Sequence, residues 1–128
     1  MKLLLDTHIL LWAAADMLPP SASEYVHDES NIVLFSPASI WEVVIKRGLG
    51  RSDFDVDPYL LLSGLMENGY EQLKITAHHA LLTASLPMHH KDPFDRILLA
   101  QSISESVSLL TADNMMTKYP ASVILVKR

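Results

Sequence analysis

Two kinds of segment alternate along the chain: short apolar runs, and longer stretches in which apolar residues recur every three or four positions. The short runs have the length and aliphatic composition of buried strands. They cover residues 2–5, 31–35, 72–75, 108–111 and 122–126. The amphipathic stretches predict helices over residues 7–15, from residue 21, and over 37–48, 58–68, 76–85 and 93–105.

Local end signals support several of these helices. Ser36, Asp57 and Asp92 each precede a proline, which is typical of an N-cap followed by the first helical residue. Ser21 and Glu24 have the spacing of a capping box, so the second helix is predicted to begin there. The near-regular alternation of strands and helices predicts an α/β fold with a mainly parallel sheet.

Length and composition are those of one globular domain, which we expect to span residues 1–128. The chain has no cysteine, which excludes disulfides, cysteine metal sites and thiol catalysis, and fits a cytoplasmic protein. The net charge of −5 argues against a protein that coats nucleic acid through a basic surface. It does not exclude nucleic acid handled at a metal centre, where carboxylates form the site.

The N-terminal apolar run does not predict a membrane segment. Asp6 and His8 interrupt it, and the uninterrupted stretch over residues 9–15 is too short to cross a bilayer. We therefore expect a soluble protein with no membrane association.

Several familiar motifs are incomplete. The segment Gly48-Leu49-Gly50 lacks the third glycine of a dinucleotide-binding loop, and no phosphate-binding lysine loop or serine elbow is present. The aspartates of residues 53–57 are followed by Pro58 where a calcium loop needs glycine. The histidine pairs at 78–79 and 89–90 lack zinc-protease spacing, and the first pair is expected on a helix surface.

Four acidic residues lie where a parallel sheet would place a site. Asp6 ends the first strand and Asp113 follows the fourth, while Glu42 and Asp95 lie in helices that begin near strand ends. Sites in open α/β sheets gather at the carboxyl ends of the strands. Carboxylates that converge repel one another unless a cation neutralises them, and hard oxygen ligands suit Mg²⁺ or Mn²⁺.

Each acid also has a purely local interpretation. Asp6 and Asp113 can cap the helices that follow them, and Glu42 can pair with Lys46 one turn later. Asp92 and Asp95 can serve as the N-cap and first-turn acid of one helix. These interpretations require no chemistry and remain open at this point.

Four stretches carry a resemblance to a known family: LLLDTHILLW, SPASIWEVVIKRGLG, HHKDPFDRILLAQS and SLLTADN. In these, the chain resembles the PIN-domain ribonucleases, in particular the toxins of VapC-type toxin–antitoxin pairs. The resemblance implies a three-layer α/β/α sandwich, endoribonuclease activity, one or two Mg²⁺ or Mn²⁺ ions, homodimerisation and inhibition by a cognate antitoxin. It gives the acidic, metal-binding roles to Asp6, Glu42, Asp95 and Asp113.

Two rival classes remain. A phosphate-handling regulator would need an acidic pair after the first strand and an acid after the third. The first strand is followed by Asp6 alone, and the third strand contains Lys74 and has no acid after it. A non-catalytic interaction module fits if the carboxylates are dispersed.

For an RNA-cleaving protein, the candidate phosphate contacts are Arg96, Lys46, Arg47 and Arg51.

Apolar residues near the candidate ligands suggest partner surfaces. Trp12 and Trp41, with Leu11 and Ile45, are expected partly in the core and partly on helix faces left uncovered. We expect one such face to form a two-fold homodimer. A groove near the acids is expected to take an antitoxin segment whose Arg or Lys pairs with Asp6 or Asp95.

Overall fold

The computed structural model describes residues 1–127; Arg128, the last residue of the expected domain, lies outside them. Within residues 1–127, five strands form one sheet: β1 Lys2–Leu5, β2 Ile32–Phe35, β3 Glu71–Gln72, β4 Ser108–Thr111 and β5 Val123–Leu125. The α-helices are α1 Thr7–Ala14, α2 Pro20–Val26, α3 Pro37–Gly48, α4 Pro58–Glu67, α5 Ala77–Leu82 and α6 Pro93–Glu105. Short 3₁₀ turns are η1 Ser52–Phe54, η2 Thr83–Ser85 and η3 Asn114–Lys118.

The strands are all parallel and lie in the order β3-β2-β1-β4-β5, which confirms the predicted α/β class. Leu4 on β1 is in register with Leu34 on β2 and with Leu109 on β4. From β1 the chain builds outward through β2 and β3, and then returns to the other side of β1 with β4 and β5. The strand order therefore reverses between β1 and β4, the position where sites form in open α/β sheets.

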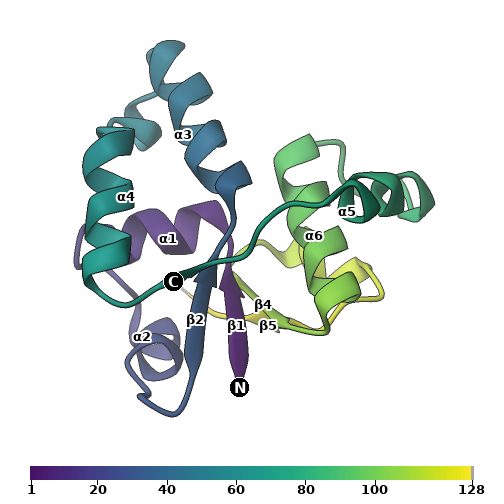
Figure 1. Cartoon of the computed structure of the whole chain (residues 1–128), viewed down its shortest axis with the longest axis horizontal. Helices are drawn as coiled ribbons and strands as arrows, with labels where there is room; N and C mark the ends of the chain where they lie inside the picture. The colour runs from purple at the N-terminus through teal and green to yellow at the C-terminus, as the bar shows by residue number, and fades with distance from the viewer. Residues whose placement is uncertain (128) are drawn as a thin grey trace.

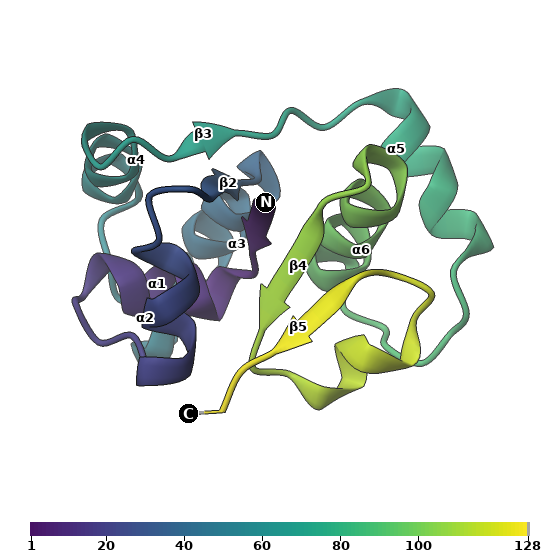
Figure 2. The same cartoon turned by 90° about the horizontal axis from the view of Figure 1, so that it is seen from below.

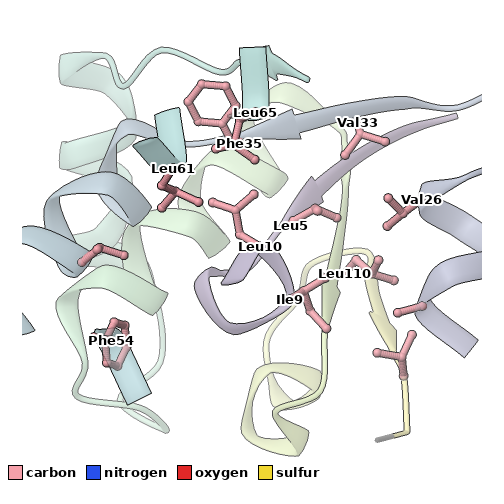
Figure 3. Packing of buried hydrophobic residues seen from close by; sticks show 13 residues of the cluster. Leu5, Ile9, Leu10, Val26, Val33, Phe35, Phe54, Leu61, Leu65 and Leu110 are labelled. Carbon is pink, nitrogen blue, oxygen red and sulfur yellow. The ribbon is translucent and has the colours of Figure 1, made fainter. Parts of the chain in front are cut away.

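Helices cover both faces of the sheet, so the three-layer sandwich is confirmed. Successive strand residues point to opposite faces. Leu5 and Leu110 therefore pack in a cluster that includes Ile9 and Leu10 of α1 (Figure 3). Leu4 and its neighbours pack instead against α6 in a second cluster. Figures 1 and 2 show α1, α2 and α4 on one side of the sheet and α5 and α6 on the other.

The three cap–proline signals are confirmed. Ser36 Oγ accepts a hydrogen bond from the Ala38 amide at 3.1 Å and begins α3. The Asp57 carboxylate caps α4 and the Asp92 carboxylate caps α6, each accepting from the second amide that follows, at 2.8 Å. A short polar side chain can satisfy the free amides of a helix start locally, which is why the sequence alone predicted these positions.

Three local expectations are wrong. Helix α2 begins at Pro20 without a side-chain cap, because Ser21 Oγ donates instead to the Lys127 carbonyl at 2.9 Å. His79 is buried rather than on the helix surface, with its Nδ1 accepting from the Thr76 amide and its Nε2 at 3.0 Å from Glu105 Oε2. The third strand covers only Glu71–Gln72, the two residues that pair with β2, and not residues 72–75.

Candidate functional site

Asp6 lies at the point where the strand order reverses. Its amide donates to the Leu110 carbonyl of β4 at 3.0 Å, which ties the end of β1 to its neighbour. Its carboxylate begins α1 by accepting from the Ile9 amide at 2.9 Å, and its other oxygen accepts from the Thr111 hydroxyl. Burial raises the pKa of Asp6, while the hydrogen bonds from Thr111 and Ile9 act against that rise. The acid is thus rigidly placed and buried.

Glu42 projects from α3 and is buried. The Lys46 ammonium pairs with Glu42 Oε2 and lies 3.6 Å from Asp92 Oδ2. Burial acts to lower the pKa of Lys46, but the hydrogen bond and charge of Glu42 raise it overall, so this side chain is a cation. The second oxygen, Glu42 Oε1, has no hydrogen-bond partner among residues 1–127. A buried carboxylate oxygen without a partner is costly and calls for a ligand.

Asp95, in the first turn of α6, is joined to Asp113 by one histidine. His90 Nε2 lies 2.8 Å from Asp95 Oδ2 and 3.2 Å from Asp113 Oδ2. One ligand atom from each of these residues lies within 4.8 Å of the other two, which is close enough to hold one metal ion. This group combines the end of β4, the first turn of α6 and the segment that precedes α6.

The charges of four other acids act on Asp95. Burial and the charges of Asp92, Asp6, Glu42 and Asp113 raise its pKa to about 8. Burial is the larger cause of this rise, and the negative charges of the four other acids add to it. The local contacts predicted for the individual acids exist as well: Asp113, for example, caps η3 through the Met115 amide at 2.9 Å. The local contacts therefore do not exclude a shared site.

Sequence reasoning did not identify two side chains of this cluster, His90 and Thr111. The Thr111 hydroxyl contacts Asp6, and its oxygen also accepts from the Asp113 amide at 3.0 Å. Its only signal in the sequence is its position as the last residue of a strand that precedes an acid. Nothing in the sequence distinguishes His90 from its neighbour His89.

The four basic residues predicted to contact phosphate all have partners within the chain. Lys46 pairs with Glu42, as described above. Arg47 lies 3.8 Å from Asp55, and Arg51 lies 2.8 Å from Asp53. The Arg96 guanidinium donates to carbonyls of the segment between α5 and α6, those of Thr83, Leu86, Pro87 and His90. Arg47 and Arg51 are the two that are exposed.

A groove of about 1090 Å³ adjoins the acids. Asp6 and Asp113 line it, together with apolar side chains that include Leu11, Trp12 and Val126. Lys127 also lines the groove, and Asp53 and Asp55 add further negative charge. The combination of an apolar lining with several acids suits a basic, amphipathic ligand. Within residues 1–127, no helix has the length and apolar character needed to cross a membrane.

Comparisons with solved structures show a shared fold at low sequence identity. The chain is similar to the crystal structure of VapBC2 from Rickettsia felis bound to a DNA fragment from their promoter, with a TM-score of 0.69 and 18% identity over 99% of this chain and 98% of that chain. VapBC-1 from nontypeable Haemophilus influenzae gives a TM-score of 0.65 and 16% identity over 98% of each chain. VapBC-5 from Mycobacterium tuberculosis, a member of the VapBC family of toxin-antitoxin systems, gives 0.64 and 15% over 99% and 98%.

No curated protein sequence matches the chain. A family model described as the PIN domain matches residues 3–121, a range that contains all four predicted acids. It also spans the sheet from β1 to β4 and every helix. The chain belongs to the PIN-domain family.

Proposed function

We propose that this chain is a metal-dependent endoribonuclease that hydrolyses RNA to products with 5′-phosphate and 3′-hydroxyl ends. The observation that carries the proposal is the cluster of carboxylates around Asp95, where burial and the neighbouring negative charges together raise the pKa of Asp95 to about 8. Such a cluster is unfavourable by itself and favourable around a cation. Membership of the PIN-domain family, whose members are generally nucleases, supports the same conclusion.

Asp6, Glu42, Asp95 and Asp113 would hold one or two Mg²⁺ or Mn²⁺ ions. The residues fit such ions, because all four offer carboxylate oxygens and Glu42 Oε1 is buried without a partner among the described residues. When bound, the cation would lower the pKa of the attacking water and offset negative charge on the phosphodiester.

The remaining side chains position these acids. Thr111 and the Ile9 amide hold both oxygens of Asp6, and Lys46 holds one oxygen of Glu42. In the overall reaction the water oxygen bonds to phosphorus, the bond from phosphorus to the 3′ oxygen breaks, and that oxygen gains a proton. Of the four basic residues predicted to contact phosphate, Arg47 and Arg51 are exposed and are therefore best able to exchange their present partners for RNA phosphate.

End analysis of the cleavage products tests this proposal. A structured RNA incubated with the protein and Mn²⁺ should give 5′-phosphate and 3′-hydroxyl ends, and chelation should abolish cleavage. Asp6→Asn and Asp95→Asn should each reduce the rate by at least about 100-fold, because each removes charge at the reacting centre. Asp16→Asn, on an exposed residue, is the matched control and should retain the rate. Cyclic 2′,3′-phosphate ends formed without metal would contradict the mechanism.

We infer further that the nuclease is the toxin of a toxin–antitoxin pair and acts in the cytoplasm. The structural likeness to VapBC proteins supports this inference. The groove beside Asp6 and Asp113 would take a segment of the antitoxin, with an Arg or Lys paired to Asp6 or Asp95. Co-expression with the neighbouring small gene product should relieve growth arrest, and the complex should bind Mn²⁺ more weakly than the free protein. Unchanged Mn²⁺ binding in an inhibited complex would leave blocked access to RNA as the mode of inhibition.

A further inference from the structure

His90 is held in the candidate site at both its backbone and its side chain. Its amide donates to the Tyr119 hydroxyl oxygen at 2.6 Å, and its carbonyl accepts from the Arg96 guanidinium at 3.2 Å. Its ring nitrogen Nδ1 accepts from the Asp92 amide at 3.4 Å. These contacts hold the imidazole in place independently of the contacts that its second nitrogen makes with the acids.

The contact at Nδ1 determines where the ring carries its hydrogen. A nitrogen that accepts from an amide has no hydrogen of its own, so in a neutral ring the hydrogen is on Nε2. Nε2 is the atom that lies 2.8 Å from Asp95 Oδ2 and 3.2 Å from Asp113 Oδ2. His90 thus points an N–H group between two carboxylate oxygens that belong to the cluster.

We propose that His90 is a positioning residue that holds Asp95 and Asp113 together by hydrogen-bond donation in the metal-free protein, and that it competes with a divalent cation for those two oxygens. This inference rests on the proposed metal-dependent function. It assigns His90 a role opposite to that of a metal ligand, although the three side chains lie close enough for joint ligation.

The tautomer is the reason for preferring competition to ligation. To bind a cation, Nε2 must lose its hydrogen, and a neutral ring then carries the hydrogen on Nδ1. That hydrogen would face the amide of Asp92, so a hydrogen bond would be replaced by a contact between two donors. The cation is expected instead to take the carboxylate oxygens and to release the imidazole from them.

Calorimetric titration with Mn²⁺ separates the two roles. His90→Ala should tighten Mn²⁺ binding by roughly two- to tenfold, the factor equivalent to one competing hydrogen bond. His90→Gln, which can replace the Nε2 donor with its amide, should return the affinity towards that of the wild-type protein. The control His89→Ala changes the adjacent exposed histidine and should leave the affinity unchanged. Weaker or unchanged Mn²⁺ binding by His90→Ala would overturn the proposal.

Nitrogen NMR of the wild-type imidazole provides a test that does not depend on a variant folding. In the metal-free protein the His90 ring should show its hydrogen on Nε2, and Mg²⁺ should leave that hydrogen in place while the signal shifts. A hydrogen on Nδ1, or loss of the Nε2 hydrogen when Mg²⁺ binds, would overturn competition in favour of ligation. RNA that stays intact while the NMR result holds would count against the proposed nuclease and not against the role of His90.

Discussion

The Thr111 hydroxyl donates a hydrogen bond to Asp6 Oδ2, and so joins the end of β4 to the end of β1 within the candidate site. The same oxygen accepts from the Asp113 amide at 3.0 Å. One threonine therefore sets the position of two predicted metal ligands that are far apart in the sequence. This side-chain link adds to the backbone hydrogen bond from the Asp6 amide to the Leu110 carbonyl.

Thr111→Val keeps the shape of the side chain and removes both contacts. The hydrogen bond from Thr111 acts to lower the pKa of Asp6, so this pKa should rise further in the variant. The free energy of unfolding should fall by about 1–3 kcal/mol, because a buried acceptor and an amide lose their partner. Chemical denaturation and RNA cleavage measure the two effects. Thr111→Ser should restore both, and a Thr111→Val protein with wild-type stability would show that the link is unimportant.

Asp95→Asn should stabilise the metal-free protein in alkaline conditions. Burial and the neighbouring acids raise the folded-state pKa of Asp95 to about 8 from its ordinary value of 3.8. The folded protein therefore binds the Asp95 proton more tightly than the unfolded chain does. The free energy of unfolding falls as the pH rises from 3.8 to about 8, the window between the two pKa values. The variant should lack this fall and be more stable by about 1–3 kcal/mol near the top of the window.

Thermal unfolding in chelator across the same pH window measures the effect. Asp16→Asn, on an exposed residue, should keep the pH dependence of the wild-type protein. If Asp95→Asn were less stable than the wild-type protein throughout, the helix-start role of Asp95 would outweigh its repulsion by the other acids.

Arg96 organises the segment that carries His90. Its guanidinium donates to the carbonyls of Thr83, Leu86, Pro87 and His90, at distances of 2.8 to 3.2 Å. Arg96→Ala should lower the free energy of unfolding by about 2–4 kcal/mol, because four carbonyls lose a shared donor. Arg96→Lys should recover only part of the loss, since one ammonium cannot reach all four. Stability close to wild type in both variants would favour Arg96 as a phosphate contact only.

Arg47 and Arg51 should govern how RNA binding depends on salt. Each contact of a cation with the phosphate of a single strand contributes about 0.7 to the slope of log affinity against log salt concentration. Replacing both arginines with glutamine should therefore reduce the slope by about 1.4 in a filter-binding titration. Lys2→Gln, at the opposite end of β1 from Asp6, is the control. An unchanged slope in the double variant would mean that neither arginine contacts phosphate.

The exposed apolar side chains of α3 are expected to belong to the interface of a homodimer. Trp41, Val44 and Ile45 are 62%, 49% and 37% exposed, and their spacing places them on one face of the helix. Val44→Glu should convert a dimer to a monomer in light scattering at micromolar concentration, because it introduces a charge into an apolar contact. Leu81→Glu changes a residue that is 73% exposed on α5 and should leave the mass unchanged. A wild-type monomer would exclude the dimer.

The sequence alone was sufficient for features whose causes are local. Apolar runs separated by amphipathic stretches predicted the parallel α/β architecture, since only a sheet covered on both faces buries such strands. Asp57 and Asp92 were predicted as caps because a cap and the amides it satisfies lie within three residues. The acids that follow β1 and β4 were predicted to meet, because parallel neighbours end at the same edge.

The tertiary structure decided everything that depends on partners distant in the chain. His79 and Glu105 are in contact although they are 26 residues apart in the sequence, and His90 and Asp113 are 23 residues apart. A local sequence pattern therefore cannot distinguish these two histidines from their exposed neighbours. The sequence suggests that Arg96 is a phosphate contact, whereas in the structure its guanidinium donates to backbone carbonyls such as that of Thr83. The pKa of Asp95 likewise depends on charges brought in by other elements, because electrostatic energy depends on distance in space and not on separation along the chain.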